Sequence, residues 1–403
     1  MAHTRLDVVL LFTARSIRLF AYGALSVVLA LYLNQVGLSG GQIGMLFTLT
    51  LFGDAGISLW ITTTADRIGR KRMLLLGAGL MVLAGIVFSL TDDIVLLIIA
   101  GIIGVISPSG NEIGPFLSLE QAALSQLLPS QKRTHSFAWY NLAGSLASAL
   151  GALAAGFASK ALLNAGYSEL ASYRAVIYGY AGCGVILVLL FLFLSKGVEA
   201  APANAGKEKR VLGLHKSRGV VMKLSGLFAL DAFAGGFVIQ SMVAYWFHIK
   251  FNVDTALLGS IFFGANIFAG LSGLLAAGIA NRIGLINTMV FTHIPSNVLL
   301  ILVPLMPNLT LAITMLLLRF SISQMDVPTR QSYTMAVVDP DERSAASGVT
   351  TIARSIGAAV SPALAGVLLA SPALIGVPFV IAGGLKIVYD LLLYRNFRKA
   401  DVK

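Results

Sequence analysis

The sequence predicts an all-α integral membrane protein whose twelve transmembrane helices form two pseudo-symmetric six-helix bundles. Three observations support this prediction: the composition, the recurrence of long apolar segments, and a similarity between the two halves of the chain. Hydrophobic residues make up 57% of the 403 residues and charged residues only 12%, about half the charged share of a soluble domain. The apolar segments are too long, and alternate too little, for a membrane β-barrel.

Twelve apolar segments reach the length of about 20 residues that a helix needs to cross a bilayer. They cover residues 7–33, 42–63, 73–91, 94–128, 135–159, 173–195, 219–247, 256–279, 285–306, 309–338, 344–369 and 373–394. The longest connection between them is polar and basic, which is typical of a flexible tether. We therefore expect an N-terminal bundle over 1–195, a cytoplasmic linker over 196–218 and a C-terminal bundle over 219–403.

The fourth segment, residues 94–128, is too long to cross a bilayer as a straight helix. It contains SPSGNEIGP (107–115), in which two prolines and two glycines are expected to break or kink the helix. Backbone groups that such a break frees at membrane depth must face protein or water. The alternative is an unbroken helix that simply starts late, after a long outer loop.

The two halves of the chain resemble each other at corresponding places. ADRIG (65–69) between the second and third segments corresponds to ANRIG (280–284) between the eighth and ninth. EQAALSQLLPSQKR (120–133) corresponds to RQSYTMAVVDPDER (330–343) in the same way. Two six-helix repeats in the same orientation predict a transporter whose site lies between the halves, near the membrane midplane.

The net charge of +11 does not indicate nucleic-acid binding, because Lys and Arg are concentrated in the N-terminus and in alternate loops. This is the positive-inside pattern of membrane proteins. It predicts a multi-pass protein of the cell inner (plasma) membrane with both termini cytoplasmic. Arg15 and Arg18 interrupt the first apolar segment, so a cleavable signal peptide is not expected there.

The sequence shows no pattern of an enzyme, a metal site or a cofactor site. Its five His residues are scattered singly, without an HExxH motif or a Cys/His cluster, and no glycine-rich nucleoside-phosphate loop is present. ATP is therefore not expected to drive the protein. A passive channel is an alternative to a carrier, which saturable kinetics would distinguish.

The loop TTTADRIGRKRM (62–73) carries a recognisable motif. It resembles the signature loop of the major facilitator superfamily, whose D-R-x-G-R-K part is matched by Asp66, Arg67, Gly69, Arg70 and Lys71. Four positions before the Asp, the family usually has Gly, and this chain has Thr62. With the degenerate second copy, the twelve segments and the basic linker, the resemblance extends over essentially the whole chain.

This resemblance implies the major facilitator fold and a gating role for the loop. In the family, the acid of the motif contacts the other half and helps to hold the outward-open state, so the resemblance implies that role for Asp66. The second copy has Asn281 in place of the acid, and any charge latch should therefore be single and asymmetric. The alternative is a loop whose basic residues only set the topology.

Polar and charged residues inside the expected helices predict the path of a solute, because a charge in the bilayer is costly and is seldom kept without a function. In the superfamily, the first, fourth, seventh and tenth helices line the central cavity, and charged residues of this chain fall on all four. The predicted substrate-binding or coupling residues are Arg18, Tyr22, Asp54, Glu120, Asn141, Asp231, Arg319, Asp326, Arg330 and Arg354.

Spacing along the helices predicts how some of these charges are arranged. Arg319, Asp326 and Arg330 should lie on one stripe of one helix, with a kink at Pro328 between the last two charges. Lys386 and Asp390 are four residues apart and should form an ordinary pair.

Each of the predicted charges could also have a purely structural role. In particular, Arg15 or Arg18 could form a permanent buried ion pair with Asp54 or Glu120.

Two carboxylates are candidate proton carriers. Burial disfavours the charged form of a carboxylate and a neighbouring Arg favours it. Asp326 lies between two Arg residues and could alternate between an Arg partner and a proton. Asp231 has no cation within reach on its own helix, and we expect it to be protonated more readily.

The predicted function is secondary active transport of a small organic solute by alternating access, as proton-coupled efflux. Its partners would be the solute, protons and membrane lipid, without nucleic acid, and the protein would work as a monomer. Uptake or exchange of an anionic metabolite is an alternative that the many intramembrane Arg residues favour. A lipid or amphiphile flippase on the same fold is another.

Overall fold

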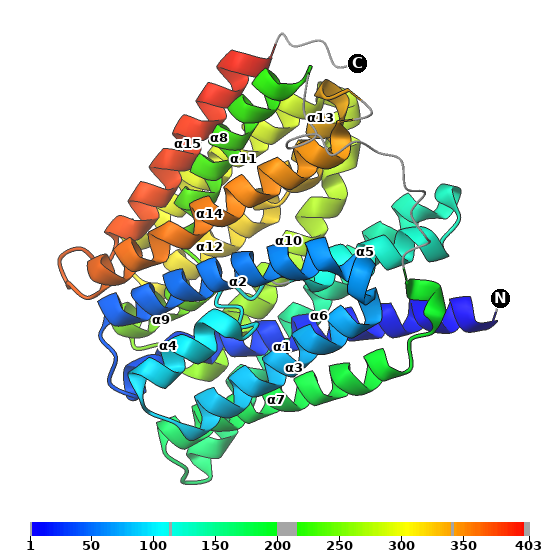
Figure 1. The fold of residues 1–403 in the computed structure, drawn as a ribbon. Coiled ribbons are helices and arrows are strands. Elements are labelled where there is room, and N and C mark those ends of the chain that lie inside the picture. The colour runs from blue at the N-terminus through cyan, green and yellow to red at the C-terminus, as the bar shows by residue number, and fades with distance from the viewer. Residues whose placement is uncertain (1, 113–114, 200–215, 340–341, 399–403) are drawn as a thin grey trace. The chain divides into compact units, whose positions relative to one another are not determined.

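The computed structural model describes residues 2–112, 115–199, 216–339 and 342–398, and these parts are helical apart from short connections and breaks (Figure 1). The α-helices are α1 (Ala2–Gln35), α2 (Gly40–Ile68), α3 (Arg70–Leu90), α4 (Ile94–Ile103), α5 (Phe116–Leu127), α6 (Ser130–Asn164), α7 (Glu169–Leu192), α8 (Arg218–Gly236), α9 (Gln240–Phe251), α10 (Thr255–Ile283), α11 (Leu285–Leu302), α12 (Leu309–Ser323), α13 (Asp326–Val337), α14 (Arg343–Leu369) and α15 (Val377–Phe397). Two short 3-10 helices are η1 (Lys196–Val198) and η3 (Val303–Leu305).

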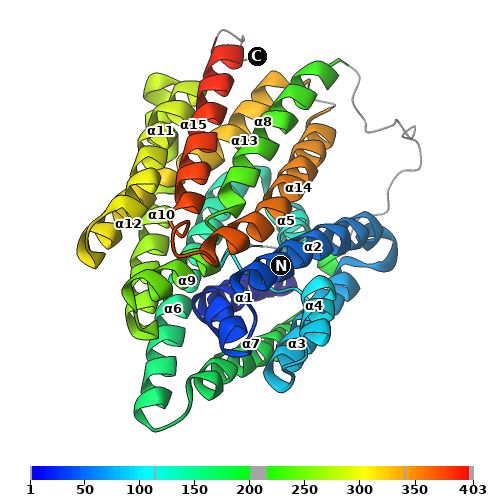
Figure 2. The same ribbon diagram turned by 90° about the vertical axis from the view of Figure 1, so that its left-hand side faces the viewer.

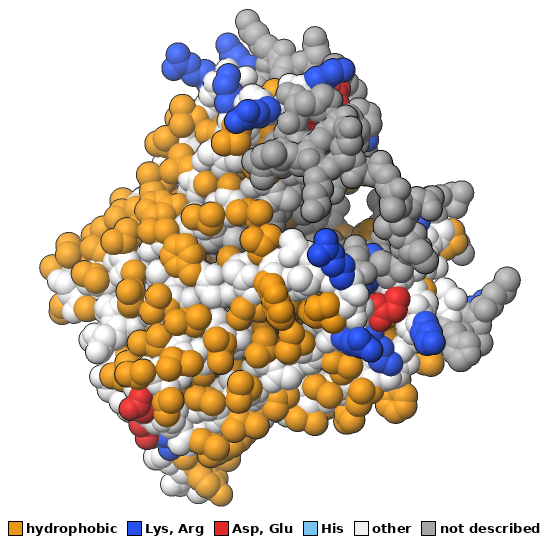
Figure 3. Space-filling view, viewed as in Figure 1, with side chains coloured by type: hydrophobic (Ala, Val, Ile, Leu, Met, Phe, Trp, Pro, Cys, Tyr) orange, Lys and Arg blue, Asp and Glu red, His pale blue; other side chains and the backbone are white. Residues whose placement is uncertain are grey.

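Among the described residues, 11 helical segments are long and apolar enough to cross a membrane. Two of them are the nearly continuous pairs α8–α9 and α12–α13. The remaining expected segment, residues 94–128, is divided into α4 and α5, each too short to cross alone. Hydrophobic side chains cover much of the face shown in Figure 3, as a lipid-facing surface requires. The predicted all-α membrane fold is confirmed.

The predicted break in the fourth segment is confirmed, because residues 104–112 are not helical. Gly110 has a φ of 68°, in the left-handed region that favours glycine. The freed carbonyl groups find partners within the protein: that of Pro108 accepts from the Ser241 amide at 3.0 Å, and that of Gly110 from the Ser148 hydroxyl at 3.0 Å. The break therefore leaves these backbone groups satisfied, as membrane depth demands.

The tenth segment is interrupted earlier than expected. The helix ends at Ser323 and restarts at Asp326, so the predicted kink between Asp326 and Arg330 is wrong. Pro328 has no amide hydrogen for the carbonyl of Gln324, the residue four positions before it, and its ring crowds that carbonyl. The interruption lies at that residue, and Pro328 then occupies the first turn of α13, where proline is tolerated.

The chain divides into two compact units, described here separately. Unit 1 comprises Met1–Asn204 with Gln240–Asn266, and unit 2 comprises Ala205–Ile239 with Ile267–Lys403. Helix α9 and the first part of α10 thus pack with the N-terminal helices, although the sequence places them in the second half. The unpredicted interruption between α8 and α9, at residues 237–239, coincides with one unit boundary.

In unit 1, α1 packs along α6 and α7, and α3 lies beside α7 (Figure 1). Small residues bring α1 and α6 close together, as is common between membrane helices. A Cβ atom on Gly151 of α6 would lie 1.9 Å from the Phe20 carbonyl oxygen of α1. A Cβ atom on Gly23 of α1 would lie 2.1 Å from the Ser148 carbonyl oxygen of α6. The contact therefore requires glycine on both helices.

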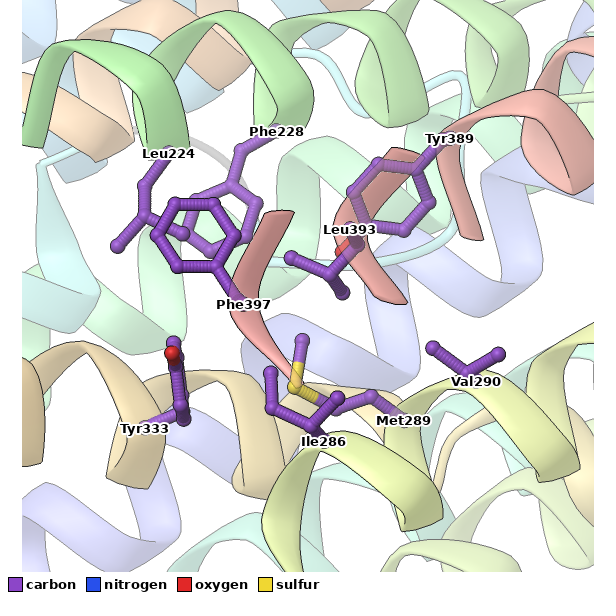
Figure 4. Packing of buried hydrophobic residues seen from close by; sticks show 9 residues of the cluster. All are labelled: Leu224, Phe228, Ile286, Met289, Val290, Tyr333, Tyr389, Leu393 and Phe397. Atoms are coloured by element: carbon purple, nitrogen blue, oxygen red, sulfur yellow. The ribbon is translucent and has the colours of Figure 1, made fainter. Parts of the chain in front are cut away.

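Unit 2 is built around α8, α11, α14 and α15, with α15 beside both α8 and α11 (Figure 2). Its hydrophobic core joins four helices (Figure 4). The buried core residues are Leu224 and Phe228 of α8, Ile286, Met289 and Val290 of α11, Tyr333 of α13, and Tyr389, Leu393 and Phe397 of α15. This packing fixes α15 against α11, which positions the polar residues discussed below.

We expect Gly151→Leu to destabilise unit 1 by about 1 to 3 kcal/mol, because the added side chain would force α6 away from α1. Thermal unfolding of the purified protein in detergent would measure the loss. Gly179→Leu on α7 is the matched control, since nothing lies within 4 Å of a Cβ atom there. Equal stability of the two variants would contradict the close contact of α1 and α6.

Candidate functional site: buried charge clusters

Arg18 of α1 lies at the centre of a buried ion cluster in unit 1. Its side chain is 0% exposed, and two of its nitrogens, Nη1 and Nη2, donate to Glu120 Oε1 and Oε2 at 2.7 Å each. Its Nε donates to Glu112 Oε1 at 2.7 Å. Planar, two-point contacts of this kind are the strongest that guanidinium groups form with carboxylates. Of the ion pairs that the sequence left open for Arg15 and Arg18, the one between Arg18 and Glu120 is present.

Arg15 extends this cluster toward α6. Its Nη1 donates to Glu112 Oε2 at 2.9 Å and its Nη2 to Asn141 Oδ1 at 3.2 Å. Its guanidinium group lies 4.3 Å from the ring centroid of Tyr140, whose hydroxyl donates to Glu120. Gly144 provides the space, because a Cβ atom there would lie 2.8 Å from Arg15 Nε. We call Arg15, Arg18, Glu112 and Glu120 the unit 1 cluster; its formal charge is zero.

Two other predicted residues, Tyr22 and Asp54, also lie in unit 1. Tyr22 is buried one turn after Arg18, with its ring stacked on Tyr180 at a centroid distance of 6.4 Å. Asp54 lies half-buried on α2 and accepts a hydrogen bond from Ser58 at 3.5 Å.

Asp231 of α8 lies at the centre of the unit 2 cluster and contacts three cations. Its Oδ1 is 2.5 Å from Lys386 Nζ, and its Oδ2 is 2.9 Å from Arg354 Nη1 and 3.3 Å from Arg330 Nη1. Arg330 also binds Asp326 at 2.8 Å. The sequence analysis considered only cations on the helix of Asp231 and missed these partners, which come from α13, α14 and α15.

Arg319 adds a further positive charge to unit 2. It lies on α12 and, because the helix is interrupted, does not continue the stripe of Asp326 and Arg330 as expected. Within the described parts of the chain it forms no ion pair, and its guanidinium group lies 4.8 Å from the Phe320 ring centroid. We include it in the unit 2 cluster with Asp231, Asp326, Arg330, Arg354 and Lys386. Four cations and two carboxylates leave a surplus of two positive charges.

The predicted gating loop is a tight turn whose residues form hydrogen bonds with the end of α7 and with Glu199. Gly69, with a φ of 113°, ends α2 and precedes α3. Lys71 Nζ donates to the carbonyl groups of Leu192 and Leu194 at the end of α7, at 2.7 Å each. Glu199 in turn accepts the Arg70 amide at 2.6 Å, at the start of α3. A carboxylate is favourable at the N-terminus of a helix and an ammonium group at the C-terminus, which explains the positions of Glu199 and Lys71.

The other two charged residues of the motif, Asp66 and Arg67, add no described contact to this turn. Arg67 is exposed in the last turn of α2. The side chain of Asp66, and with it the implied latch, lies outside the described residues.

Sequence reasoning missed a buried polar group between α11 and α15. His293 Nδ1 lies 2.9 Å from Asp390 Oδ1, and Asn297 Nδ2 donates to Asp390 Oδ2 at 3.1 Å. The predicted pair of Lys386 with Asp390 was wrong, because each residue binds a partner on another helix. The four-residue spacing of His293 and Asn297 within an apolar helix was the available signal.

Residues that could hold a metal ion are not grouped in the described structure. No set of three or more His, Cys, Asp or Glu side chains there has the proximity that a metal site needs. The clusters are instead alternating networks of carboxylate, guanidinium and ammonium groups. Such networks can bind a charged or polar solute, or exchange partners as helices move.

Comparison with known proteins identifies the family. The family model of the Major Facilitator Superfamily matches residues 11–362. The uncharacterized membrane protein YJR124C of Saccharomyces cerevisiae is 31% identical over 427 residues, covering 98% of this chain and 95% of that protein. The purine ribonucleoside efflux pump NepI of Escherichia coli is 24% identical over 242 residues, covering 59% of this chain and 56% of the pump.

A solved structure shares the fold. The crystal structure of a mutant of the nucleoside transporter NupG aligns over 97% of this chain and 99% of that chain, with a TM-score of 0.79 and 15% identity. The family points to a transporter rather than an enzyme. Because the family model covers most of the residues and the helical fold agrees with it, this chain belongs to the Major Facilitator Superfamily.

Proposed function

We propose that this protein is a secondary transporter that moves a small organic solute across the plasma membrane by alternating access, as proton-coupled efflux. The observation that carries this proposal is the presence of buried ion clusters within membrane-spanning helices of both units. Ionised groups at such depth are costly and line solute or proton pathways more often than they serve stability alone. The basic residues of alternate loops support cytoplasmic termini.

Nucleosides are the first solutes to test. The names of the efflux pump NepI and of the transporter NupG both refer to nucleosides. Nucleosides carry hydroxyl and ring nitrogen groups that guanidinium, carboxylate and amide side chains can bind. Efflux is favoured because a sequence relative with a described function, NepI, is an efflux pump.

The test is proton movement in proteoliposomes that contain a trapped pH dye. Pools of purine nucleosides, sugars and organic anions are added in turn, and protein-free liposomes serve as the control. We expect one pool to move protons with saturable kinetics and to exchange with labelled solute from the other side. Uptake that never saturates would indicate a channel, and covalently changed solute would indicate an enzyme; either result would overturn the proposal.

A second candidate is uptake or exchange of an anionic metabolite. It is favoured by the surplus of two positive charges in the unit 2 cluster, where the side chain of Arg354 is 33% exposed. A guanidinium fork binds carboxylate or phosphate groups well and keeps its charge. The low dielectric constant within the membrane would strengthen the electrostatic attraction in such a contact.

The two candidates make different predictions for Arg354→Gln. If the solute is anionic, we expect its KM to rise by about tenfold or more, because one charge-assisted contact is lost. A neutral solute should be transported with little change in KM. Arg395→Gln, at an exposed position near the end of α15, is the control.

A further inference from the structure

The hydrogen-bonded group of His293, Asn297 and Asp390 lies apart from the contacts of the unit 2 cluster. Asp390 and Asn297 are 0% exposed and His293 is 4% exposed. The ring of Tyr389 packs edge-on against the imidazole, with centroids 6.1 Å apart. Tyr389 itself belongs to the hydrophobic core (Figure 4). A carboxylate in such apolar surroundings is costly and requires close compensation.

The partners of Asp390 differ in kind from those of the other buried carboxylates described above. Asp231 and Asp326 both contact Arg330, and Glu120 is bound by Arg18. Arginine keeps its proton at all relevant pH values, so protonating those acids would break an ion pair. Asp390 instead contacts an imidazole and an amide. An imidazole exists in a neutral and a protonated form, and in either form it can donate from Nδ1, so this pair can take up one proton and keep its hydrogen bond.

Lys386 is the residue of the unit 2 cluster that lies on the same helix as Asp390. Asp390 and Lys386 lie one turn apart on α15, and Lys386 Nζ contacts Asp231 at 2.5 Å. Asp231 and Lys386 are also charged groups that act electrostatically on Asp390. The other charged residues on the helices that pack against α11 and α15 are Arg218 and Lys223 of α8, Arg319 of α12, Asp326 and Arg330 of α13, and Arg343 and Arg354 of α14, and α15 itself also carries Arg395.

The position of Lys386 on α15 places two carboxylates, those of Asp231 and Asp390, within reach of its ammonium group. In this structure its ammonium group binds Asp231 on α8. The four-residue spacing also allows it to bind Asp390 on its own helix. A proton on the His293–Asp390 pair adds one positive charge beside Lys386 and favours its contact with Asp231. Loss of that proton favours a contact with Asp390, which would leave Asp231 to its two arginines.

We propose that His293 and Asp390 together form the binding site of the coupling proton, and that Lys386 transmits the occupancy of this site to Asp231. One proton binds and is released, and no other bond is formed or broken. The role of Lys386 in coupling rests on the proton-coupled transport proposed above. Binding of a proton by His293 and Asp390 does not depend on that proposal. The site replaces Asp326 and Asp231 as the principal candidate for carrying the proton.

Proton uptake by the purified full-length protein in detergent tests the site without any solute. The protein is titrated from about pH 8 to pH 5, the range over which an unperturbed imidazole changes charge. We expect wild type to bind about one proton more than the double variant His293→Gln/Asp390→Asn. Asp326→Asn, which removes a carboxylate paired with arginine, is the matched control and should titrate as wild type does.

Infrared difference spectra of wild type over the same pH range give a second measurement that does not depend on the double variant folding. The conservative Asp390→Glu variant should keep the proton uptake but shift the carboxyl bands that change with pH. Spectra whose pH-dependent carboxyl bands are identical in wild type and Asp390→Glu would overturn the site.

A transport assay distinguishes failure of the proton-binding site from failure of the proposed proton-coupled transport. With a purine nucleoside pool in proteoliposomes, Lys386→Met should lose proton movement, while its proton uptake in detergent stays the same. If wild type binds the proton but no pool moves protons, the proposed coupling fails and the proton site stands. If the double variant binds as many protons as wild type, the site fails whatever the transport result.

Discussion

Glu120→Gln should lower the free energy of unfolding by about 3 to 5 kcal/mol, because it leaves Arg18 buried without its two-point partner. Gln keeps the size of the side chain but offers one oxygen, and that oxygen carries no charge. Glu112 already uses one oxygen on Arg18 and the other on Arg15, so it cannot replace the lost carboxylate. Reversible unfolding of the purified protein by denaturing detergent would measure the change.

Asp92→Asn is the control for this result. Asp92 pairs with Arg174 in the same unit, but its side chain is 58% exposed. Exposed ion pairs contribute less than about 1 kcal/mol. A loss of the same size in both variants would show that the burial of the Arg18 pair has no special energetic effect.

Asp231→Asn is expected to have a comparable effect on unit 2, with a loss of about 3 to 5 kcal/mol. The carboxylate compensates Lys386, Arg330 and Arg354, and among the described residues Arg330 is the one of these three cations that also forms an ion pair with a second acid in this structure, Asp326. The same change should abolish coupled transport, because Lys386 would lose one of its two acids. Unfolding in denaturing detergent and proton movement in proteoliposomes would measure the two effects.

A double-mutant cycle tests whether the loss arises from uncompensated charge. Lys386→Met in the Asp231→Asn background removes one of the stranded cations and should recover part of the stability. The expected coupling energy lies within the range of about 0.5 to 3 kcal/mol seen for residues in contact. Strict additivity of the two losses would show that the contact of Asp231 with Lys386 contributes nothing to stability.

The sequence predicted the features that arise within one helix. The apolar segments predicted the helices, and the prolines and glycines of residues 107–115 predicted the break before α5, because their backbone effects are local. The interruption after α8 contains no proline and was missed. It lies at a boundary between the two units, where tertiary packing rather than local propensity decides the path of the chain.

The partners of the buried charges could not be predicted in the same way. Periodicity shows which residues share a face of a helix, but not which helix meets that face. Lys386 and Asp390 satisfied the four-residue rule, yet each finds a stronger or more completely buried partner on another helix. The ion pair of Arg18 with Glu120 was one of several that the sequence left open, because it could not show whether Arg15 or Arg18 meets Asp54 or Glu120.

The unit 1 cluster also has a consequence for biogenesis. The first helix leaves the ribosome carrying Arg15 and Arg18, each costing about 2.5 to 3.5 kcal/mol at the centre of a lipid-exposed helix. The carboxylate that binds Arg18 at two points is synthesised 102 residues later. Until α5 emerges, α1 is poorly suited to lipid and should remain beside the insertion machinery. Because of this order of synthesis, we expect α1 to leave the insertion machinery for the lipid only after the fourth membrane segment has been made.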